Sequence, residues 1–343
     1  MITRSLGSSG LEISGLILGT ATFGGAYAAW GASDIAEATR IVDIALHAGI
    51  TMFDTADVYS AGAAEEILGR AIGDRRSDVL IATKVGMRMS DSAGDAGLSR
   101  GRIIASCEAS LRRLRTDHID LYQLHAFDGC VGLDETLGAL DELQRAGKIR
   151  YHGVSNFSGW HLMKTVAAAE RLGVSAPVAQ QAYYSLVARE FEWELMPLGD
   201  DQDIATLVYS PLGGARLSGK LGRGKPVPQE SRVAAGAAGP GLDEEKLYSI
   251  TDALEAVASE GGWTVAQVAL AWALGRPTVA GLVIGARNED QLVANLGAAD
   301  IRLSSEQVER LDAASAQPAA YPYWHQQMLS RERNVHPLDA SRG

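Results

Sequence analysis

Four titratable side chains of different types follow three apolar segments of the sequence. Asp54 ends the first segment and Tyr59 comes five residues later, while Lys84 and His125 directly follow the other two. A free tyrosine has a pKa of about 10, which is too high for efficient proton donation near neutral pH. A neighbouring ammonium would lower that pKa, and an aspartate would keep the lysine charged. Because a histidine can also hydrogen-bond a substrate oxygen, the set fits proton donation to a developing alkoxide.

Each of these residues also has an ordinary structural explanation. A lysine at a strand end can be a solvated surface residue, an aspartate can cap a turn, and a tyrosine is often half-buried packing. The occurrence of all four types at successive segment ends favours a shared site. One histidine and one aspartate fall short of a zinc ligand set, so we expect no metal.

Short apolar segments alternate with stretches of helical spacing along most of the chain. Eight segments are expected to be strands: 16–18, 51–55, 79–83, 119–124, 151–154, 178–181, 205–209 and 281–284. Seven stretches are expected to be helices: 34–47, 64–72, 100–114, 133–146, 160–172, 242–258 and 290–296. Alternation implies parallel strands, and eight of them favour an α/β fold of the (β/α)8 barrel (TIM barrel) type. In such a barrel the carboxyl ends of the strands meet at one rim.

Three regions depart from this alternation. Residues 1–15 predict a β-hairpin, because a Gly/Ser turn separates two short strand-like runs. Residues 213–241 are rich in Gly, Pro and Ala and predict a long loop after the seventh strand. The tail 317–343 is expected to be loop-like. The alternation resumes after residue 241, so we expect a single domain over residues 1–343.

Composition limits the classes of partner. The net charge of −11 argues against nucleic acid. No apolar run reaches the roughly 18 residues of a membrane span, and no signal peptide is recognisable. A cytoplasmic location is therefore expected, with Cys107 and Cys130 as two reduced cysteines that form no disulfide framework. A homo-oligomer is compatible with the sequence, which does not decide the oligomeric state.

Four segments together resemble the signature regions of the aldo-keto reductases. They are Phe53-Asp-Thr-Ala-Asp-Val-Tyr59, Ile81-Ala-Thr-Lys84, Asp117-His-Ile-Asp-Leu-Tyr-Gln-Leu-His125 and Gly147-Lys-Ile-Arg-Tyr-His-Gly-Val-Ser-Asn156. The resemblance extends from the hairpin to about Asp312 and is nearest to the branch with aryl-alcohol dehydrogenase-like proteins and potassium-channel beta subunits. It implies that Tyr59 donates the proton, that Lys84 and Asp54 tune it, and that His125 orients a carbonyl. Hydride would come from a reduced nicotinamide.

Two familiar nucleotide-binding motifs are missing. No GxGxxG follows a strand, and the run Gly214 to Lys220 begins like a P-loop but has Leu221 where a Ser or Thr should bind Mg²⁺. The same run resembles instead the segment of the aldo-keto reductases in which an aromatic ring stacks on the nicotinamide and a loop holds the pyrophosphate. Composition alone leaves that interpretation and simple loop packing even. The cofactor residues implied by the resemblance are Ser155, Asn156, Gln181, Tyr209, Ser210, Pro211, Leu212, Gly214, Lys220, Ile284, Gly285, Arg287, Gln291 and Asn295.

Arg287 suggests the form of the cofactor, because a guanidinium can bind a 2′-phosphate through two hydrogen bonds. The best-known family pattern has a lysine in this turn and an arginine on the next helix, where this chain has Ala286 and Gln291. Because of Arg287 we expect NADP(H), and because of the departure from the family pattern NAD(H) stays as the alternative.

Four aromatic residues follow the first and fourth strands and could line an apolar substrate pocket: Phe23, Tyr27, Trp30 and Phe127. Loop packing explains them equally well. The expected substrate is a small aldehyde or ketone, aromatic aldehydes included. Two other functions stay open at this point. One is a cofactor-sensing binding protein with slow turnover, and the other is an aldolase that uses Lys84 as a Schiff base.

Overall fold

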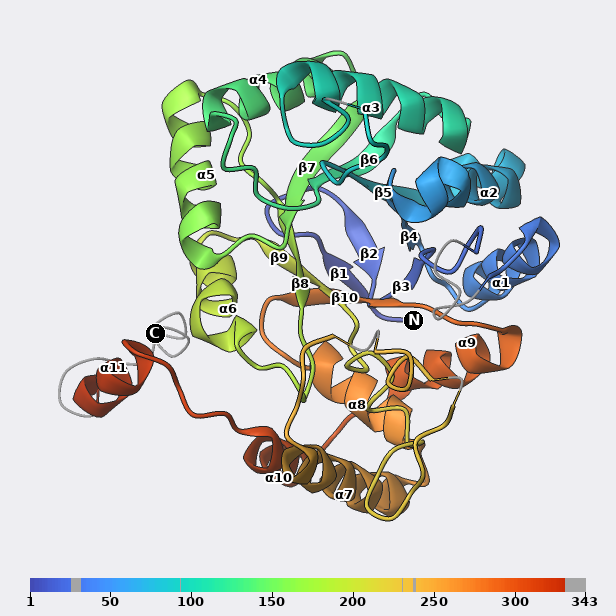
Figure 1. The fold of residues 1–343 in the computed structure, drawn as a ribbon, viewed down its shortest axis with the longest axis vertical. Coiled ribbons are helices and arrows are strands. Elements are labelled where there is room, and N and C mark those ends of the chain that lie inside the picture. The colour runs from blue at the N-terminus through green and yellow to red at the C-terminus, as the bar shows by residue number, and fades with distance from the viewer. Residues whose placement is uncertain (26–31, 93, 230, 237–238, 331–343) are drawn as a thin grey trace.

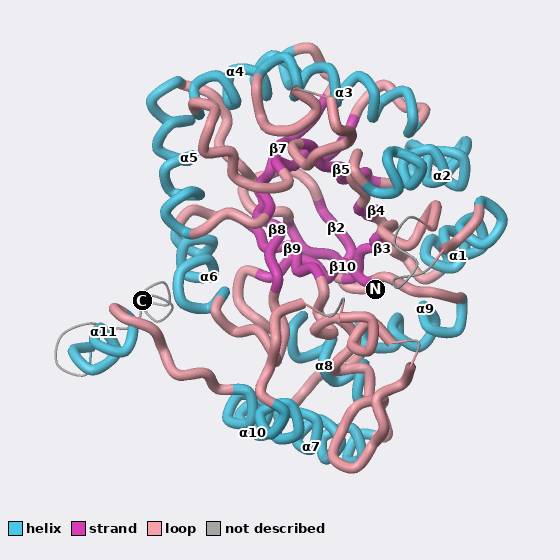
Figure 2. The backbone as a smooth tube through the Cα atoms, in the orientation of Figure 1, coloured by secondary structure: helices cyan, strands magenta, loops and turns pink. Residues whose placement is uncertain are grey.

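Eight parallel strands close into a barrel surrounded by helices, which confirms the predicted (β/α)8 fold (Figures 1 and 2). The computed structural model describes residues 1–25, 32–92, 94–229, 231–236 and 239–330. Neighbouring strands follow the order β10-β3-β4-β5-β6-β7-β8-β9, and β10 pairs with β3 to close the ring. The strands are β3 (Leu16–Gly19), β4 (Met52–Asp54), β5 (Leu80–Val85), β6 (Ile119–Leu124), β7 (Ile149–Ser155), β8 (Ala179–Tyr183), β9 (Ala205–Tyr209) and β10 (Val279–Ile284).

The helices lie outside the barrel, and all but the last of them pack around it against the apolar outer faces of the strands or against each other (Figure 2). They are α1 (Ile35–His47), α2 (Ala63–Ile72), α3 (Arg100–Leu114), α4 (Leu133–Arg145), α5 (Gly159–Leu172), α6 (Phe191–Asp201), α7 (Glu244–Gly261), α8 (Val265–Leu274), α9 (Glu289–Leu296), α10 (Ser305–Ser315) and α11 (Tyr323–Ser330). Local sequence fixes several helix starts: Asp34 accepts a hydrogen bond from the backbone of Glu37, and Thr264 and Ser304 each form a capping box.

A β-hairpin closes the amino-terminal end of the barrel, as the sequence predicts. Its strands, β1 (Thr3–Ser5) and β2 (Glu12–Ser14), pair antiparallel. Leu6 and Ile13 are fully buried and pack on side chains of the barrel interior. Arg4 donates hydrogen bonds to the carbonyls of Leu274 and Val279, at 2.7 and 2.6 Å. The hairpin therefore plugs one end of the barrel, and the chemistry must lie at the other.

Strand register gathers polar side chains at the carboxyl end. Lys84 lies opposite Gln123 across the β5–β6 pair, and Ser155 lies opposite Gln181 across the β7–β8 pair. The segment between β9 and α7 is the expected long loop; in its described residues it contains no helix or strand.

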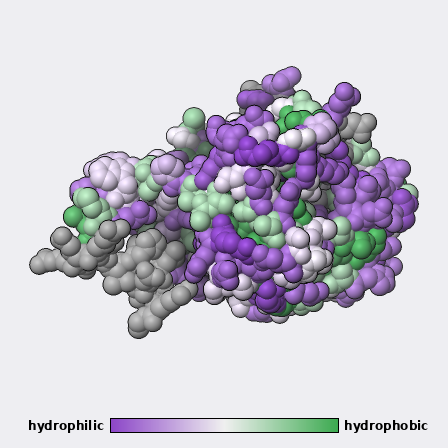
Figure 3. Space-filling model, turned by 90° about the horizontal axis from the view of Figure 1, so that it is seen from below, coloured by the Kyte–Doolittle hydropathy of each residue, from purple (hydrophilic) through white to green (hydrophobic). Residues whose placement is uncertain are grey.

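The carboxyl-terminal segment differs from expectation. The tail predicted to be loop-like contains a helix, α11, which stands away from the barrel beside α6 (Figure 1). In the space-filling view the mainly hydrophilic surface carries scattered apolar patches, and the projecting end of the chain mixes both kinds (Figure 3). Tyr321, Trp324 and Met328 are largely exposed there. Among the described residues no helix has the length and apolar character needed to cross a bilayer.

Candidate active site

A buried ion pair lies at the centre of the carboxyl-terminal rim. The Lys84 Nζ is 2.6 Å from the Asp54 Oδ1, with side chains 0% and 2% exposed. Lys84 also donates to the Thr55 carbonyl at 2.8 Å, while the amides of Gln181 and Gln123 donate to the Asp54 Oδ2 at 2.7 and 3.3 Å. Burial lowers the pKa of Lys84, but the charges of Asp54 and Tyr59 and hydrogen bonds to both outweigh it and hold that pKa above its usual value. The lysine is therefore an ammonium.

Tyr59 and His125 lie beside this ammonium. The Lys84 Nζ is 5.2 Å from the centre of the Tyr59 ring, and the Tyr59 and His125 rings meet edge to face at 6.0 Å. Burial, followed by the charge of Lys84, lowers the pKa of His125 to about 3, so its imidazole is neutral at physiological pH. The four residues identified from the sequence are thus brought together.

The backbone after Tyr59 is strained and held from outside. Ser60 and Ala61 have φ values of 49° and 52°, a left-handed conformation unusual for residues with a Cβ. The Ser60 hydroxyl donates to the Phe23 carbonyl at 2.8 Å. The Phe23 ring is 1% exposed and belongs to the hydrophobic core. Phe23, which is expected to line a substrate pocket, therefore lies in the core, where it anchors the turn that carries Tyr59.

A cavity of about 720 Å³, here called the rim cavity, opens over these groups. Its lining includes Asp54, Tyr59 and His125, whereas Lys84 lies beneath it. All fourteen residues expected to hold a cofactor also line it, although they come from four separate parts of the chain. They are Ser155, Asn156, Gln181, Tyr209, Ser210, Pro211, Leu212, Gly214, Lys220, Ile284, Gly285, Arg287, Gln291 and Asn295.

Hydrogen bonds join residues at the carboxyl ends of neighbouring strands at the inner wall of the rim cavity. The Asn156 Nδ2 donates to the His125 carbonyl at 3.0 Å, and the Asn156 Oδ1 accepts from the Tyr209 hydroxyl at 2.8 Å. Gln181 uses its amide nitrogen on Asp54. Its oxygen is therefore the side-chain atom left to accept from a ligand.

Two arginines line the outer part of the same cavity. Arg287 follows β10, and Arg232 comes from the long loop after β9. Burial, and then the nearby charge of Arg287, lowers the pKa of Arg232. Two guanidiniums in one partly buried cavity favour a bound anion, and phosphate oxygens suit them in charge and shape. This donor set fits the phosphates of a dinucleotide.

The turn after β10 is shaped by Gln291. Its Oε1 accepts from the Arg287 backbone N–H at 3.1 Å, while its own backbone N–H is capped by Asn288. The residue that stands where the family's arginine is expected thus supports the Arg287 backbone.

Of the other aromatic residues expected to line a substrate pocket, Phe127 is described by the structure and does not line the rim cavity. Phe127 stacks on His161 with ring centres 3.7 Å apart and meets the Phe157 ring edge to face at 5.3 Å. It packs within this aromatic cluster instead. Tyr27 and Trp30 lie outside the residues that the structure describes.

Several residues of the site escaped the sequence interpretation. Gln123 contacts Asp54 from a position 69 residues away, and an alternating strand pattern marks it only as inward-facing. Arg232 lies in a loop whose composition places no side chain. Met87, at the start of the loop after β5, also lines the rim cavity.

The comparisons with known proteins agree with this geometry. Residues 15–316 match the Aldo/keto reductase family. This chain belongs to the aldo/keto reductase family. It is 37% identical to the uncharacterized oxidoreductase YrpG of Bacillus subtilis (strain 168) over 318 residues, which cover 90% of this chain and 94% of that protein. It is also similar to probable voltage-gated potassium channel beta subunits of Arabidopsis thaliana (35% over 307 residues, 87% of this chain and 91% of the relative) and Oryza sativa subsp. japonica (34% over 321 residues, 90% and 95%).

A second buried carboxylate lies close to the Tyr59 turn of this aldo/keto reductase. Asp57 is 1% exposed, and neither of its side-chain oxygens has a hydrogen-bond partner among the described residues. The Arg102 Nη2 is 3.5 Å away, and the other end of that guanidinium contacts the Asp95 Oδ1 at 2.6 Å. Burial, reinforced by the charge of Glu65, raises the pKa of Asp57 to about 7 despite Arg102.

The raised pKa of Asp57 predicts a pH-dependent stability. The folded protein holds the Asp57 proton up to about pH 7, whereas an unfolded chain releases it near pH 4. Since the folded state binds more protons in this window, the contribution of Asp57 to the free energy of unfolding falls as pH rises from about 4 to 7, by a few kcal/mol. Asp57→Asn should remove this decline, as measured by denaturant unfolding at several pH values. The exposed Asp74→Asn is the matched control, and parallel pH curves for wild type and Asp57→Asn would contradict the assignment.

Proposed function

We propose that this aldo/keto reductase reduces small aldehydes or ketones to alcohols with NADPH, and that Tyr59 donates the proton. The observation that carries the proposal is the fully buried Lys84–Asp54 pair beneath Tyr59 and His125 at the inner wall of the rim cavity. When bound, the reduced nicotinamide supplies the hydride. The described side chains account for the other requirements of the reaction.

His125 and Tyr59 would act on the substrate oxygen. A neutral imidazole has one N–H, which can donate to the carbonyl oxygen and orient it. As negative charge develops on that oxygen, the Tyr59 hydroxyl donates its proton to it. The Lys84 ammonium stabilises the phenolate left behind, and Asp54 keeps Lys84 in position and charged.

Residues around the rim cavity would hold the cofactor. Tyr209 offers a flat aromatic face to a ring, with Ser155, Asn156 and Gln181 as polar partners for its carboxamide. The loop 210–220 brings backbone N–H groups and Lys220 to the cavity, which suits a pyrophosphate. Arg287 and Arg232 would bind the 2′-phosphate, which supports NADPH over NADH.

Lys84 is a poor candidate for Schiff-base chemistry. An imine forms from a neutral, accessible amine. Lys84 is 0% exposed, hydrogen-bonded to Asp54 and Thr55, and held as an ammonium. After treatment with borohydride and a carbonyl compound, peptide mass mapping should therefore find Lys84 unmodified.

Steady-state kinetics test the function directly. Aldehyde-dependent oxidation of NADPH, with one alcohol formed per cofactor consumed, is expected across a panel that includes aromatic aldehydes. The names of the plant relatives point to the alternative, a cofactor-binding partner of a channel. Tight NADPH binding without turnover of any aldehyde would favour that alternative and contradict the reductase.

Arg287→Ala tests the cofactor preference. Loss of a charge-assisted contact to a phosphate should weaken NADPH binding by roughly 10- to 100-fold, while NADH changes little. Fluorescence titration of both cofactors measures this, with the exposed Arg70→Ala as the control. An equal loss for both cofactors would mean that Arg287 does not read the 2′-phosphate.

A further inference from the structure

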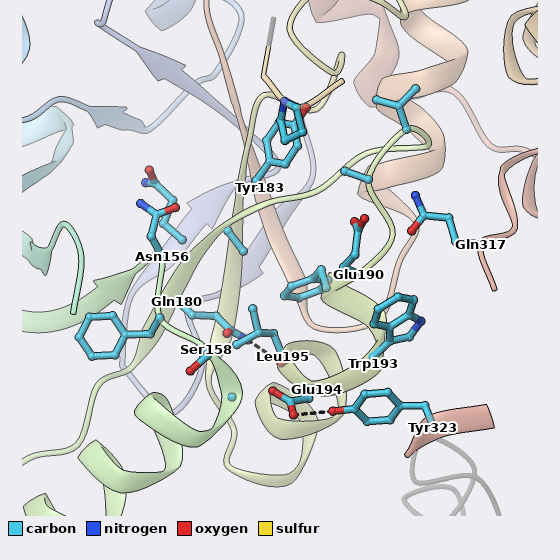
Figure 4. Close-up of a pocket in the computed structure, with 18 of the residues that line it drawn as sticks. Asn156, Ser158, Gln180, Tyr183, Glu190, Trp193, Glu194, Leu195, Gln317 and Tyr323 are labelled. Carbon is cyan, nitrogen blue, oxygen red and sulfur yellow. Dashed lines mark hydrogen bonds between the residues drawn. The ribbon is translucent and has the colours of Figure 1, made fainter. Parts of the chain in front are cut away.

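A second cavity lies next to the rim cavity. It measures about 870 Å³ and is bounded by the ends of β7 and β8, by α6, and by the chain around residues 317–323 (Figure 4). It is here called the α6 cavity. It shares two lining residues with the rim cavity, Asn156 and Gln181, and includes none of Asp54, Tyr59, Lys84 or His125. Its volume falls in the range of small-molecule sites.

Several aromatic side chains line the α6 cavity. Trp193 of α6 and Tyr323 of α11 stack with ring centres 5.9 Å apart, and Figure 4 shows this pair at the end of the cavity opposite Tyr183 and Asn156. Tyr183 in turn meets Tyr209 of the rim cavity, with ring centres 5.6 Å apart. Such walls favour a flat aromatic ligand.

One buried acceptor in the α6 cavity lacks a partner. Gln180 is 3% exposed, and its Nε2 donates to the Leu195 carbonyl at 2.7 Å and to the Thr206 hydroxyl at 3.3 Å. The Leu195 carbonyl can only accept, so the amide nitrogen must face it. The Gln180 Oε1 is then buried without a hydrogen-bond partner in the described part of the chain. An unpaired buried acceptor costs about 1–3 kcal/mol, which a donor on a ligand would relieve.

The charges of the lining favour a cation. Glu190 and Glu194 both line the α6 cavity, and Glu194 accepts from the Tyr323 hydroxyl. Arg216 also lines the cavity and donates to carbonyls of the long loop, with 2.7 Å to that of Pro240, so two carboxylates face one guanidinium and the lining is net acidic. Glu190 has no ion pair among the described residues and is exposed at the cavity. A carboxylate beside aromatic rings binds an ammonium through an ion pair and cation–π contacts.

We propose that the α6 cavity is a binding site for an aromatic ammonium compound. Its ring lies against the Trp193–Tyr323 pair, and its nitrogen donates toward Glu190 and the Gln180 Oε1. Because Asn156 and Gln181 line both cavities, occupancy of this site changes the affinity for the cofactor. That second statement rests on the proposed function, since it requires the cofactor to lie in the rim cavity.

Calorimetry with two indole probes tests the charge preference on the full, cofactor-free chain. Tryptamine carries an ammonium, and 3-indolepropionate carries a carboxylate on the same ring. We expect tryptamine to bind at one site and the carboxylate to bind about tenfold more weakly or worse, from the combined loss of one ion pair and a cation–π contact. Equal affinities, or no tryptamine binding, would overturn the proposal.

Variants of Glu190 locate the site. Glu190→Gln should weaken tryptamine by roughly two- to fivefold, the value of a partly exposed ion pair, and should leave NADPH affinity unchanged. Glu190→Lys should reverse the preference toward 3-indolepropionate. Glu66→Gln, an exposed glutamate of α2, is the matched control. If the Glu190 variants bind both probes as the wild type does, the ligand lies elsewhere and the assignment is wrong.

Titrations with both ligands test the coupling. Saturating NADPH should change the dissociation constant of tryptamine by the same factor by which tryptamine changes that of NADPH, as linkage requires. Independent binding would overturn the coupling. A charge-selective site that responds to Glu190 in a protein that binds no nicotinamide cofactor would uphold the aromatic site and refute the proposed function, so the two failures are distinguishable.

Discussion

Tyr59→Phe is expected to lose carbonyl reduction by a factor of about 10²–10⁴, the usual contribution of a positioned general acid. The variant removes one oxygen atom at the rim cavity and leaves the ring against His125 and Lys84. NADPH affinity should stay within the error of the wild type, because the residues expected to hold the cofactor lie on other strands. Single-turnover rates and fluorescence titrations separate the two quantities.

Tyr151→Phe is the matched control for this result. Its hydroxyl contacts the Gly10 backbone at the hairpin end of the barrel, far from the rim in the strand direction. Wild-type turnover in Tyr59→Phe would require another proton donor and would remove Tyr59 from the mechanism. A loss of NADPH binding would show instead that the substitution disturbs the cavity.

Lys84→Met is expected to lose both activity and stability. The substitution leaves the Asp54 carboxylate 2% exposed with only amide donors, Gln123 and Gln181, around it. Removing one partner of a buried ion pair usually costs about 3–5 kcal/mol in the free energy of unfolding. Activity should fall as well, because no ammonium then stabilises the phenolate.

The double variant Lys84→Met/Asp54→Asn separates these effects. With no unpaired charge in the core, much of the lost stability should return, but activity should not. Denaturant unfolding and turnover of one aldehyde are the two measurements. A stable and active Lys84→Met would show that the ammonium is needed for neither role.

Helices and strands could be predicted from the sequence where one face of the element is buried, because the pattern of apolar residues then has the period of the element. The predicted bounds of β6, β9 and α3 agree with the structure to the residue. Four helices, α6, α8, α10 and α11, were missed, and two of these misses have a physical reason. The helix α8 is buried on nearly all sides and so lacks an amphipathic period, and α6 contains Pro197.

Some residues of the candidate site could likewise be placed from the sequence, whereas others could not. Residues at strand ends could be placed, since parallel strands deliver them to one rim, and the structure brings Asp54, Tyr59, Lys84 and His125 together. Loop aromatics could not be placed, because nothing local tells whether a ring turns inward; Phe23 lies in the core and Phe127 against His161. Arg232 and the α6 cavity depend on how distant segments fold against each other.

The hairpin that closes one end of the barrel also limits how Tyr59, the proposed proton donor, can be reprotonated. Leu6, Ile13 and the Arg4 hydrogen bonds seal the amino-terminal end of the barrel, so water has no approach to Tyr59 along the axis from that side. After each cycle the phenolate must recover its proton through the same mouth by which the alcohol departs. Product release and reprotonation then use the same opening of the rim cavity. A bulky alcohol that dissociates slowly would therefore keep Tyr59 as a phenolate.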